Sequence, residues 1–138
     1  MPSQFISRHF ILLSRLILVA IIPAVLILSL MPSEHVPGPK LNDKLLHLMA
    51  FLVISGLFDA AWPRCSFNWQ KALAVVAYGA LIEILQSFTG YRDMSGADLV
   101  ADIIGIGLYV IMIPLWRIIP IINIRWQYLE ASPSKTNL

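Results

Sequence analysis

The residues of this chain with the most chemistry to offer are ionisable and amide side chains set among long apolar stretches. The candidate site residues are Asp43, Lys44, His47, Glu83, Gln86, Arg92, Asp98 and Asp102. Lysine and arginine suit a phosphate, carboxylates and amide oxygens accept hydroxyl or amide donors, and imidazole with carboxylates suits a divalent metal. Ionisable groups inside apolar segments are costly, so their presence predicts a functional site.

Helical spacing places six of these residues in pairs. The members of each pair are three or four residues apart and share one helix face: Asp43 with His47, Glu83 with Gln86, and Asp98 with Asp102. If the helices cross a membrane in alternating directions, a rise of 1.5 Å per residue puts His47, Glu83 and Asp102 roughly 6, 9 and 10 Å below one surface. This agreement in depth predicts a polar pocket at the outer end of a helical bundle.

The composition predicts the setting of this pocket. Of 138 residues, 58% are hydrophobic and only 13% are charged, and the mean hydropathy is +0.76. Soluble domains carry about 25% charged residues, so the composition excludes an ordinary soluble domain and indicates an integral membrane protein. The net charge of +2 comes from scattered basic residues, which argues against nucleic-acid binding. A single cysteine, Cys65, excludes an intramolecular disulfide.

Four apolar segments are long enough to cross about 30 Å of hydrocarbon as helices. They cover about 10–31, 43–62, 69–88 and 95–116. We therefore predict an all-α bundle of four transmembrane helices in a single domain, 1–138. An interfacial segment at 118–124 and a polar tail at 131–138 are expected to follow. Asn42 and Ser95 are the predicted N-caps of the second and fourth helices, and Pro23 is predicted to kink the first.

The distribution of basic residues predicts the orientation of the bundle. Basic residues without balancing acids occur near the N-terminus, between the second and third segments, and after the fourth: Arg8, Arg15, Arg64, Lys71, Arg117, Arg125 and Lys135. In the other two loops, Lys40, Lys44 and Arg92 are mixed with acids. Because positive charge accumulates on the cytoplasmic side, we expect both termini inside. The alternative for the first segment is a cleaved signal peptide, but the sequence at 29–32 has no small-x-small cleavage site.

Structural pairing is the alternative to a ligand site. A carboxylate this deep must be paired, protonated or hydrated, and we predict that Glu83 pairs with Lys44, Arg92 or His47. Taken singly, Asp43, Lys44 and Asp98 also suit ordinary interfacial positions.

Two further features have structural interpretations. Asp59, near the inner end of the second segment, is predicted to be interfacial and close to Arg64 or Lys71. Small residues recur every four positions between 97 and 105 and predict a close approach of the fourth helix to a neighbour.

The ordered motifs resemble the VanZ-like family of bacterial membrane proteins. The matching stretches are Asp43-Lys44-Leu45-Leu46-His47, Tyr78-Gly79-Ala80-Leu81-Ile82-Glu83-Ile84-Leu85-Gln86, Arg92, Ser95, Asp98-Leu99-Val100-Ala101-Asp102 and Gly105. The resemblance covers about 42–107, roughly half of the chain. Asp102 stands where the family usually has asparagine, and Thr89-Gly90-Tyr91 precedes Arg92 where the family often has a proline.

The resemblance implies a multi-pass protein of the bacterial inner membrane, with membrane lipid as a partner. The family is named for a protein that gives low-level teicoplanin resistance, which implies a role in glycopeptide susceptibility.

Three functions remain open from the residues. The first is binding of an anionic envelope ligand, a lipid headgroup or a lipid-linked cell-wall intermediate, by Lys44 and Arg92. The second is a metal-dependent enzyme acting on a lipid or cell-wall precursor, with a divalent metal as cofactor and His47, Glu83 and Asp102 as candidate ligands. The third is a structural or partner subunit. The sequence carries no His-Glu-x-x-His signature.

Overall fold

The structure, a computed structural model, describes residues 4–32, 34–35, 42–92 and 94–131. Lys40, Lys135 and the tail beyond residue 131 lie outside the described residues. All regular structure in the described ranges is helical, which confirms the predicted all-α class. The helices are α1 (Gln4–Leu30), α2 (Asp43–Ala61), α3 (Trp69–Ser87), α4 (Gly96–Ile111), α5 (Ile113–Trp116) and α6 (Pro120–Ala131).

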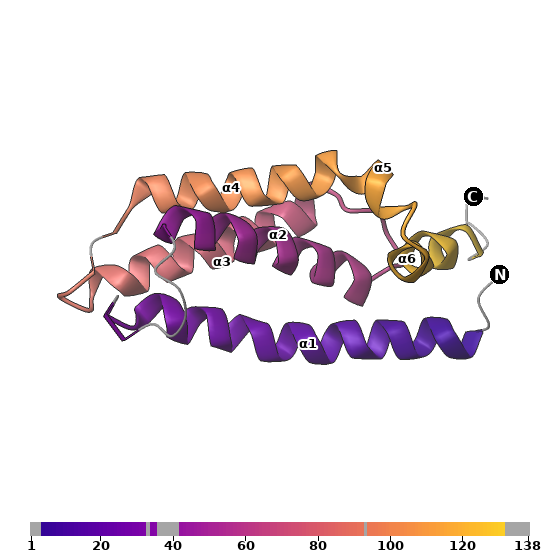
Figure 1. Cartoon of the computed structure of the whole chain (residues 1–138), viewed down its shortest axis with the longest axis horizontal. Helices are drawn as coiled ribbons and strands as arrows, with labels where there is room; N and C mark the ends of the chain where they lie inside the picture. The colour runs from indigo at the N-terminus through magenta and orange to yellow at the C-terminus, as the bar shows by residue number, and fades with distance from the viewer. Residues whose placement is uncertain (1–3, 33, 36–41, 93, 132–138) are drawn as a thin grey trace.

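The four longer helices α1 to α4 lie side by side along the length of the molecule (Figure 1). The start of α1, the α2–α3 connection and α6 are at one end, which we call the Arg125 end. The end of α1, the start of α2 and the α3–α4 connection are at the other, which we call the His47 end (Figure 1). Their shared core contains buried aliphatic and aromatic side chains: Leu18, Phe51, Ile54, Ala61, Val75, Ile82 and Ile106.

Local sequence explains where the helices begin and end. Asn42 caps α2 by accepting a hydrogen bond from the Lys44 backbone N–H, and Ser95 caps α4 by accepting one from the Asp98 N–H, so both predicted N-caps are confirmed. The predicted fourth segment divides at Met112 into α4 and α5, because Pro114 has no N–H to continue the α4 hydrogen-bond ladder. α1, by contrast, continues as one helix through Pro23.

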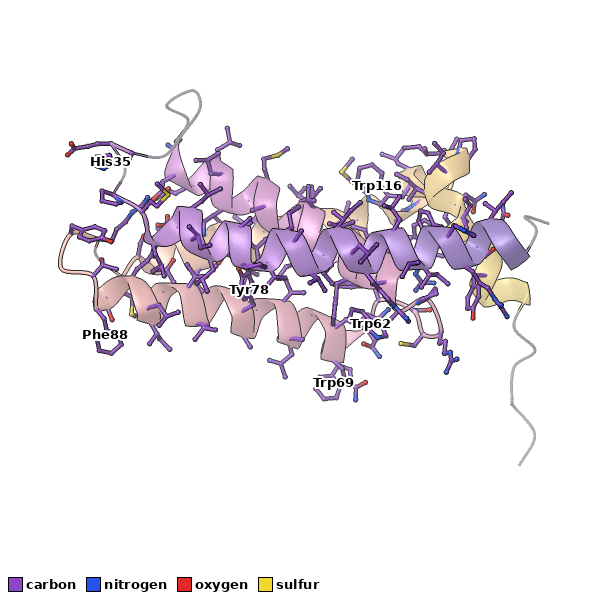
Figure 2. The ribbon with its side chains drawn as sticks, turned by 90° about the horizontal axis from the view of Figure 1, so that it is seen from below. His35, Trp62, Trp69, Tyr78, Phe88 and Trp116 are labelled. Atoms are coloured by element: carbon purple, nitrogen blue, oxygen red, sulfur yellow. The ribbon has the colours of Figure 1, made fainter. Side chains whose placement is uncertain are left out.

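Among the described residues, two helices are long and apolar enough to cross a membrane: residues Ile6–Leu30 of α1, and α2 over Asp43–Ala61. Large apolar side chains project outward from α1 along much of its length, among them Leu12, Leu16, Val19 and Ile27. Figure 2 shows side chains around the α1 ribbon along its whole length.

α2 and α4 approach each other at Gly105. A Cβ atom at this position would collide with the backbone carbonyl oxygen of Leu48, so the two backbones are in direct contact. The helix approach predicted from the small residues of the fourth segment is therefore found here, against α2. Gly107, two residues further along α4, has open space around it.

Gly105→Ala is expected to destabilise the protein by about 1–3 kcal/mol, because the methyl group must push backbone away from backbone. Gly107→Ala is the matched control. It adds the same methyl group in open space and removes a flexible helix residue, so it should stabilise by about 0.5–1 kcal/mol. Thermal unfolding of the purified variants in detergent measures both, and equal shifts would contradict the backbone contact.

Candidate functional site

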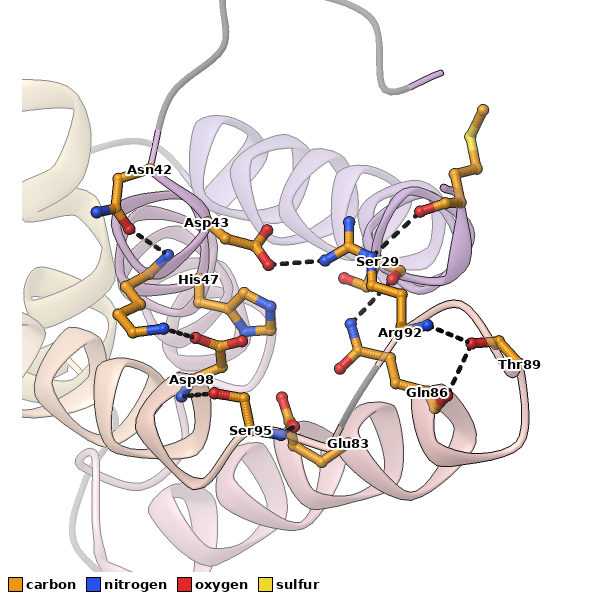
Figure 3. Close-up of polar contacts among 12 residues, drawn as sticks. Ser29, Asn42, Asp43, His47, Glu83, Gln86, Thr89, Arg92, Ser95 and Asp98 are labelled. Carbon is orange, nitrogen blue, oxygen red and sulfur yellow. Dashed lines mark hydrogen bonds and ion pairs between the residues drawn. The ribbon is translucent and has the colours of Figure 1, made fainter. Parts of the chain in front are cut away.

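The eight predicted site residues meet at the His47 end, brought there by three elements. The first two turns of α2 contribute Asp43, Lys44 and His47, the end of α3 contributes Glu83 and Gln86, and the α3–α4 connection with the start of α4 contributes the rest: Arg92, Asp98 and Asp102. Figure 3 shows side chains of this His47 cluster facing one another across a common centre.

Three side-chain contacts between elements, two of them ion pairs, hold the cluster together. Lys44 Nζ lies 2.9 Å from Asp98 Oδ1, His47 Nδ1 lies 2.9 Å from Asp102 Oδ1, and Arg92 Nη1 lies 2.7 Å from Asp43 Oδ2. The first two join α2 to α4, and the third joins α2 to the α3–α4 connection. The His47 and Asp102 side chains are 5% and 0% exposed, which makes theirs the most enclosed pair.

Glu83 is not paired with any of the cations predicted for it. Its Oε2 accepts a hydrogen bond of 2.6 Å from the backbone N–H of Ser95, the N-cap of α4. The prediction was wrong because Asp98 and Asp43 already take Lys44 and Arg92. Glu83 instead supports the turn that begins α4, a backbone contact that no charge pattern indicates.

Three buried acceptor atoms of the cluster have no hydrogen-bond donor among the described residues: Glu83 Oε1, Gln86 Oε1 and Asp102 Oδ2. Leaving such an atom unsatisfied costs about 1–3 kcal/mol. The Gln86 amide orientation follows from its other end, where Nε2 donates 2.9 Å to the Ser29 carbonyl; a flipped amide would set two oxygens against each other. The cluster therefore has unused capacity for a ligand that donates hydrogen bonds or carries positive charge.

A subset of the cluster has the chemistry of a cation site. Asp43, His47 and Asp98 each offer a ligand atom, and these atoms lie within 4.8 Å of one another. Asp102 holds Nδ1 of His47, which leaves Nε2 for a metal; an oriented histidine of this kind is common in metal centres. Of the metal ligands predicted from sequence, only His47 belongs to this trio.

Gly79 on α3 leaves room for the buried Asp102 carboxylate. A Cβ at this position would lie 2.5 Å from Asp102 Oδ2 and 3.1 Å from the Phe51 ring. Glycine at position 79 therefore has a steric reason, because α3 can pass close to the His47–Asp102 pair only where it carries no side chain.

The last turn of α1 belongs to the site, which sequence reasoning missed. The carbonyls of Ser29, Leu30 and Met31 have no partner further along their helix, and they accept hydrogen bonds from three side chains in and after α3: Gln86, Tyr91 and Arg92. Gly90, with φ of +72°, turns the chain so that the last two reach α1. Backbone carbonyls carry no residue-type signal that could have found this contact.

A second buried network lies at the Arg125 end. Asp59 is 0% exposed, and its carboxylate takes Lys71 Nζ at 2.7 Å, Arg125 Nη2 at 2.8 Å and the Tyr109 hydroxyl at 2.8 Å. The predicted proximity to Lys71 is confirmed. The sequence did not predict that α6 brings Arg125 over the carboxylate and buries it inside the protein. The sequence signal for this contact was Arg125 itself, a charged residue in the mostly apolar segment that follows residue 116.

The chain matches no protein-family model, no curated protein and no solved structure.

Asp102→Asn is expected to keep the fold, because the amide oxygen can still accept from His47 Nδ1. Asp102→Ala should cost about 1–3 kcal/mol, since it leaves that N–H buried without an acceptor. Denaturant unfolding of the two variants beside wild type measures the difference, and equal losses for asparagine and alanine would count against the hydrogen bond.

Proposed function

We propose that the chain is a VanZ-like protein of the bacterial inner membrane, with four spans and both termini in the cytoplasm. α3 and the combined 96–116 segment lie alongside α1 and α2, the two helices that are long and apolar enough to cross a membrane (Figure 1). Trp69 and Phe88 flank α3, are 72% and 80% exposed, and point away from the bundle (Figure 2). They are separated by roughly 28 Å along the helix, close to the thickness of a hydrocarbon layer bordered by aromatic residues.

The basic residues of the described ranges support the same orientation. Arg8, Arg15 and Arg64 lie at the Arg125 end and form no ion pair with another described residue, whereas Lys44 and Arg92 at the His47 end are each neutralised by an aspartate. Unbalanced positive charge favours the cytoplasmic side. Hydrogen bonds from Gln86, Tyr91 and Arg92 to α1 also support a first helix that stays with the bundle.

The function we propose is the binding of an anionic envelope ligand in the His47 cluster, a lipid headgroup or a lipid-linked cell-wall intermediate. One observation carries this proposal: three buried acceptors without donors lie in the same cluster as two cations. A ligand with hydroxyl or amide groups would satisfy the acceptors. Its phosphate would approach Lys44, whose side chain is 52% exposed, and the remaining N–H groups of Arg92. Because the chain resembles the VanZ-like family, we expect this binding to affect the susceptibility of the cell to glycopeptides.

A metal-dependent enzyme acting on the same class of precursor is the second candidate. The specific observation that favours it is the trio Asp43, His47 and Asp98, with His47 oriented by Asp102. Asp43 and Asp98 each engage their cation through one oxygen, so each has a second oxygen for a metal. A divalent metal held there would supply a Lewis acid and an activated water.

Arg92→Lys separates ligand binding from structural pairing. Lysine can still neutralise Asp43 but cannot reproduce the several directed N–H groups of a guanidinium. If Arg92 contacts a phosphate, ligand binding should fall on the order of 100-fold. Glycopeptide susceptibility of a deletion strain carrying wild type, Arg92→Lys or Arg92→Ala is the readout, with thermal unfolding as the control for the fold. Restoration by lysine would rule out this role for Arg92.

Metal binding distinguishes the second candidate. Equilibrium dialysis of the purified protein against Mn²⁺ or Zn²⁺ should give stoichiometric binding that His47→Ala abolishes, because the variant removes a ligand of the trio. His35→Ala is the matched control, since His35 is exposed and outside the cluster. Equal binding by the two variants would place the metal elsewhere and leave ligand binding as the better-supported function.

A further inference from the structure

A groove of about 520 Å³ opens at the Arg125 end, remote from the His47 cluster. It lies between the first turns of α1, the α2–α3 connection and α6. Its walls carry three arginines, Arg8, Arg15 and Arg64, and none of its lining residues is acidic.

The arginines of this groove are available to a ligand. Arg8 and Arg64 are exposed, and within the described part of the chain neither forms an ion pair. Arg15 donates from Nε to the Ala61 carbonyl, and its guanidinium stacks over the Trp62 ring, 5.7 Å from the ring centre. This contact holds the Arg15 guanidinium at the groove without neutralising its charge.

The backbone of the groove wall offers little to balance this charge. Lys71 and Arg125, on the buried side of the wall, donate hydrogen bonds to its backbone carbonyls, those of Trp62, Pro63 and Cys65. Those two cations share one carboxylate, Asp59, so the network behind the wall carries a charge of two minus one, or +1. The groove is therefore positive both at its surface and behind it.

We propose that this groove binds the phosphate of an anionic phospholipid. Guanidinium groups bind phosphate oxygens through paired hydrogen bonds, and basic pockets at the ends of membrane helices recognise anionic headgroups. Ile11 and Leu12 line the same groove and give the start of an acyl chain an apolar surface. Trp62 and Tyr128 add side chains of the kind that sit at headgroup level. The proposal requires the bundle to lie in a bilayer, but it depends neither on the leaflet nor on the His47 cluster.

The test uses the full chain in nanodiscs of phosphatidylcholine with and without phosphatidylglycerol, followed through tryptophan fluorescence and by native mass spectrometry of retained lipid. Wild type should retain phosphatidylglycerol selectively. Because a basic residue near the headgroups contributes on the order of a fivefold change in affinity, Arg8→Gln with Arg64→Gln should weaken retention roughly 30-fold. Arg117→Gln is the matched control: it removes another exposed arginine, which does not line the groove.

Each remaining outcome is decisive. Equal loss in the Arg117 variant, or no preference for phosphatidylglycerol, overturns the proposal. Displacement of the lipid by inorganic phosphate at similar concentration overturns the lipid assignment in favour of a soluble anion. If the double variant does not fold, Arg64→Gln alone carries the test, and a fivefold loss supports the site. Arg92 variants should retain the lipid normally, so failure here and failure of the proposed envelope function give different results.

Discussion

The backbone contact between α2 and α4 at Gly105 sets the register on which both polar networks depend. The two helices run in the same direction, and their partners advance together along the seam: Lys44 with Asp98, His47 with Asp102, Leu48 with Gly105, and Asp59 with Tyr109. Polar pairs in an apolar bundle must be matched closely because unpaired members are costly. A small shift between the helices would disturb pairs at both ends at once.

The two ends of the bundle have opposite chemical character. At the His47 end, the unsatisfied buried side-chain atoms are acceptors: Glu83 Oε1, Gln86 Oε1 and Asp102 Oδ2. At the Arg125 end, two buried cations, Lys71 and Arg125, share the carboxylate of Asp59, and three more arginines line the groove. The molecule therefore presents unused hydrogen-bond acceptors at one end and unbalanced positive charge at the other. The apolar core between them keeps the two environments apart.

The sequence predicted what depends on periodicity and local capping. Apolar runs located α1 to α4, Asn42 and Ser95 marked two helix starts, and three- or four-residue spacing grouped the site residues. The ion-pair and hydrogen-bond partners of single residues were less predictable, because several carboxylates come close to the same few cations in the folded chain. Glu83 was assigned a cation but accepts from the Ser95 backbone. Arg125 was missed as a partner of Asp59 because 66 residues separate them in the chain.

The hydrogen bonds at the end of α1 constrain the order in which the chain is assembled during synthesis. The donors to its last carbonyls, Gln86, Tyr91 and Arg92, are 57 to 61 residues further along the chain. At translation rates of about 5–20 residues per second, α1 waits roughly 3 to 12 s for them. During that time the C-terminal turn of α1 depends on its surroundings for the hydrogen bonds that these side chains later donate. Completion of the His47 end is therefore a late event, which follows emergence of α3 rather than formation of α1.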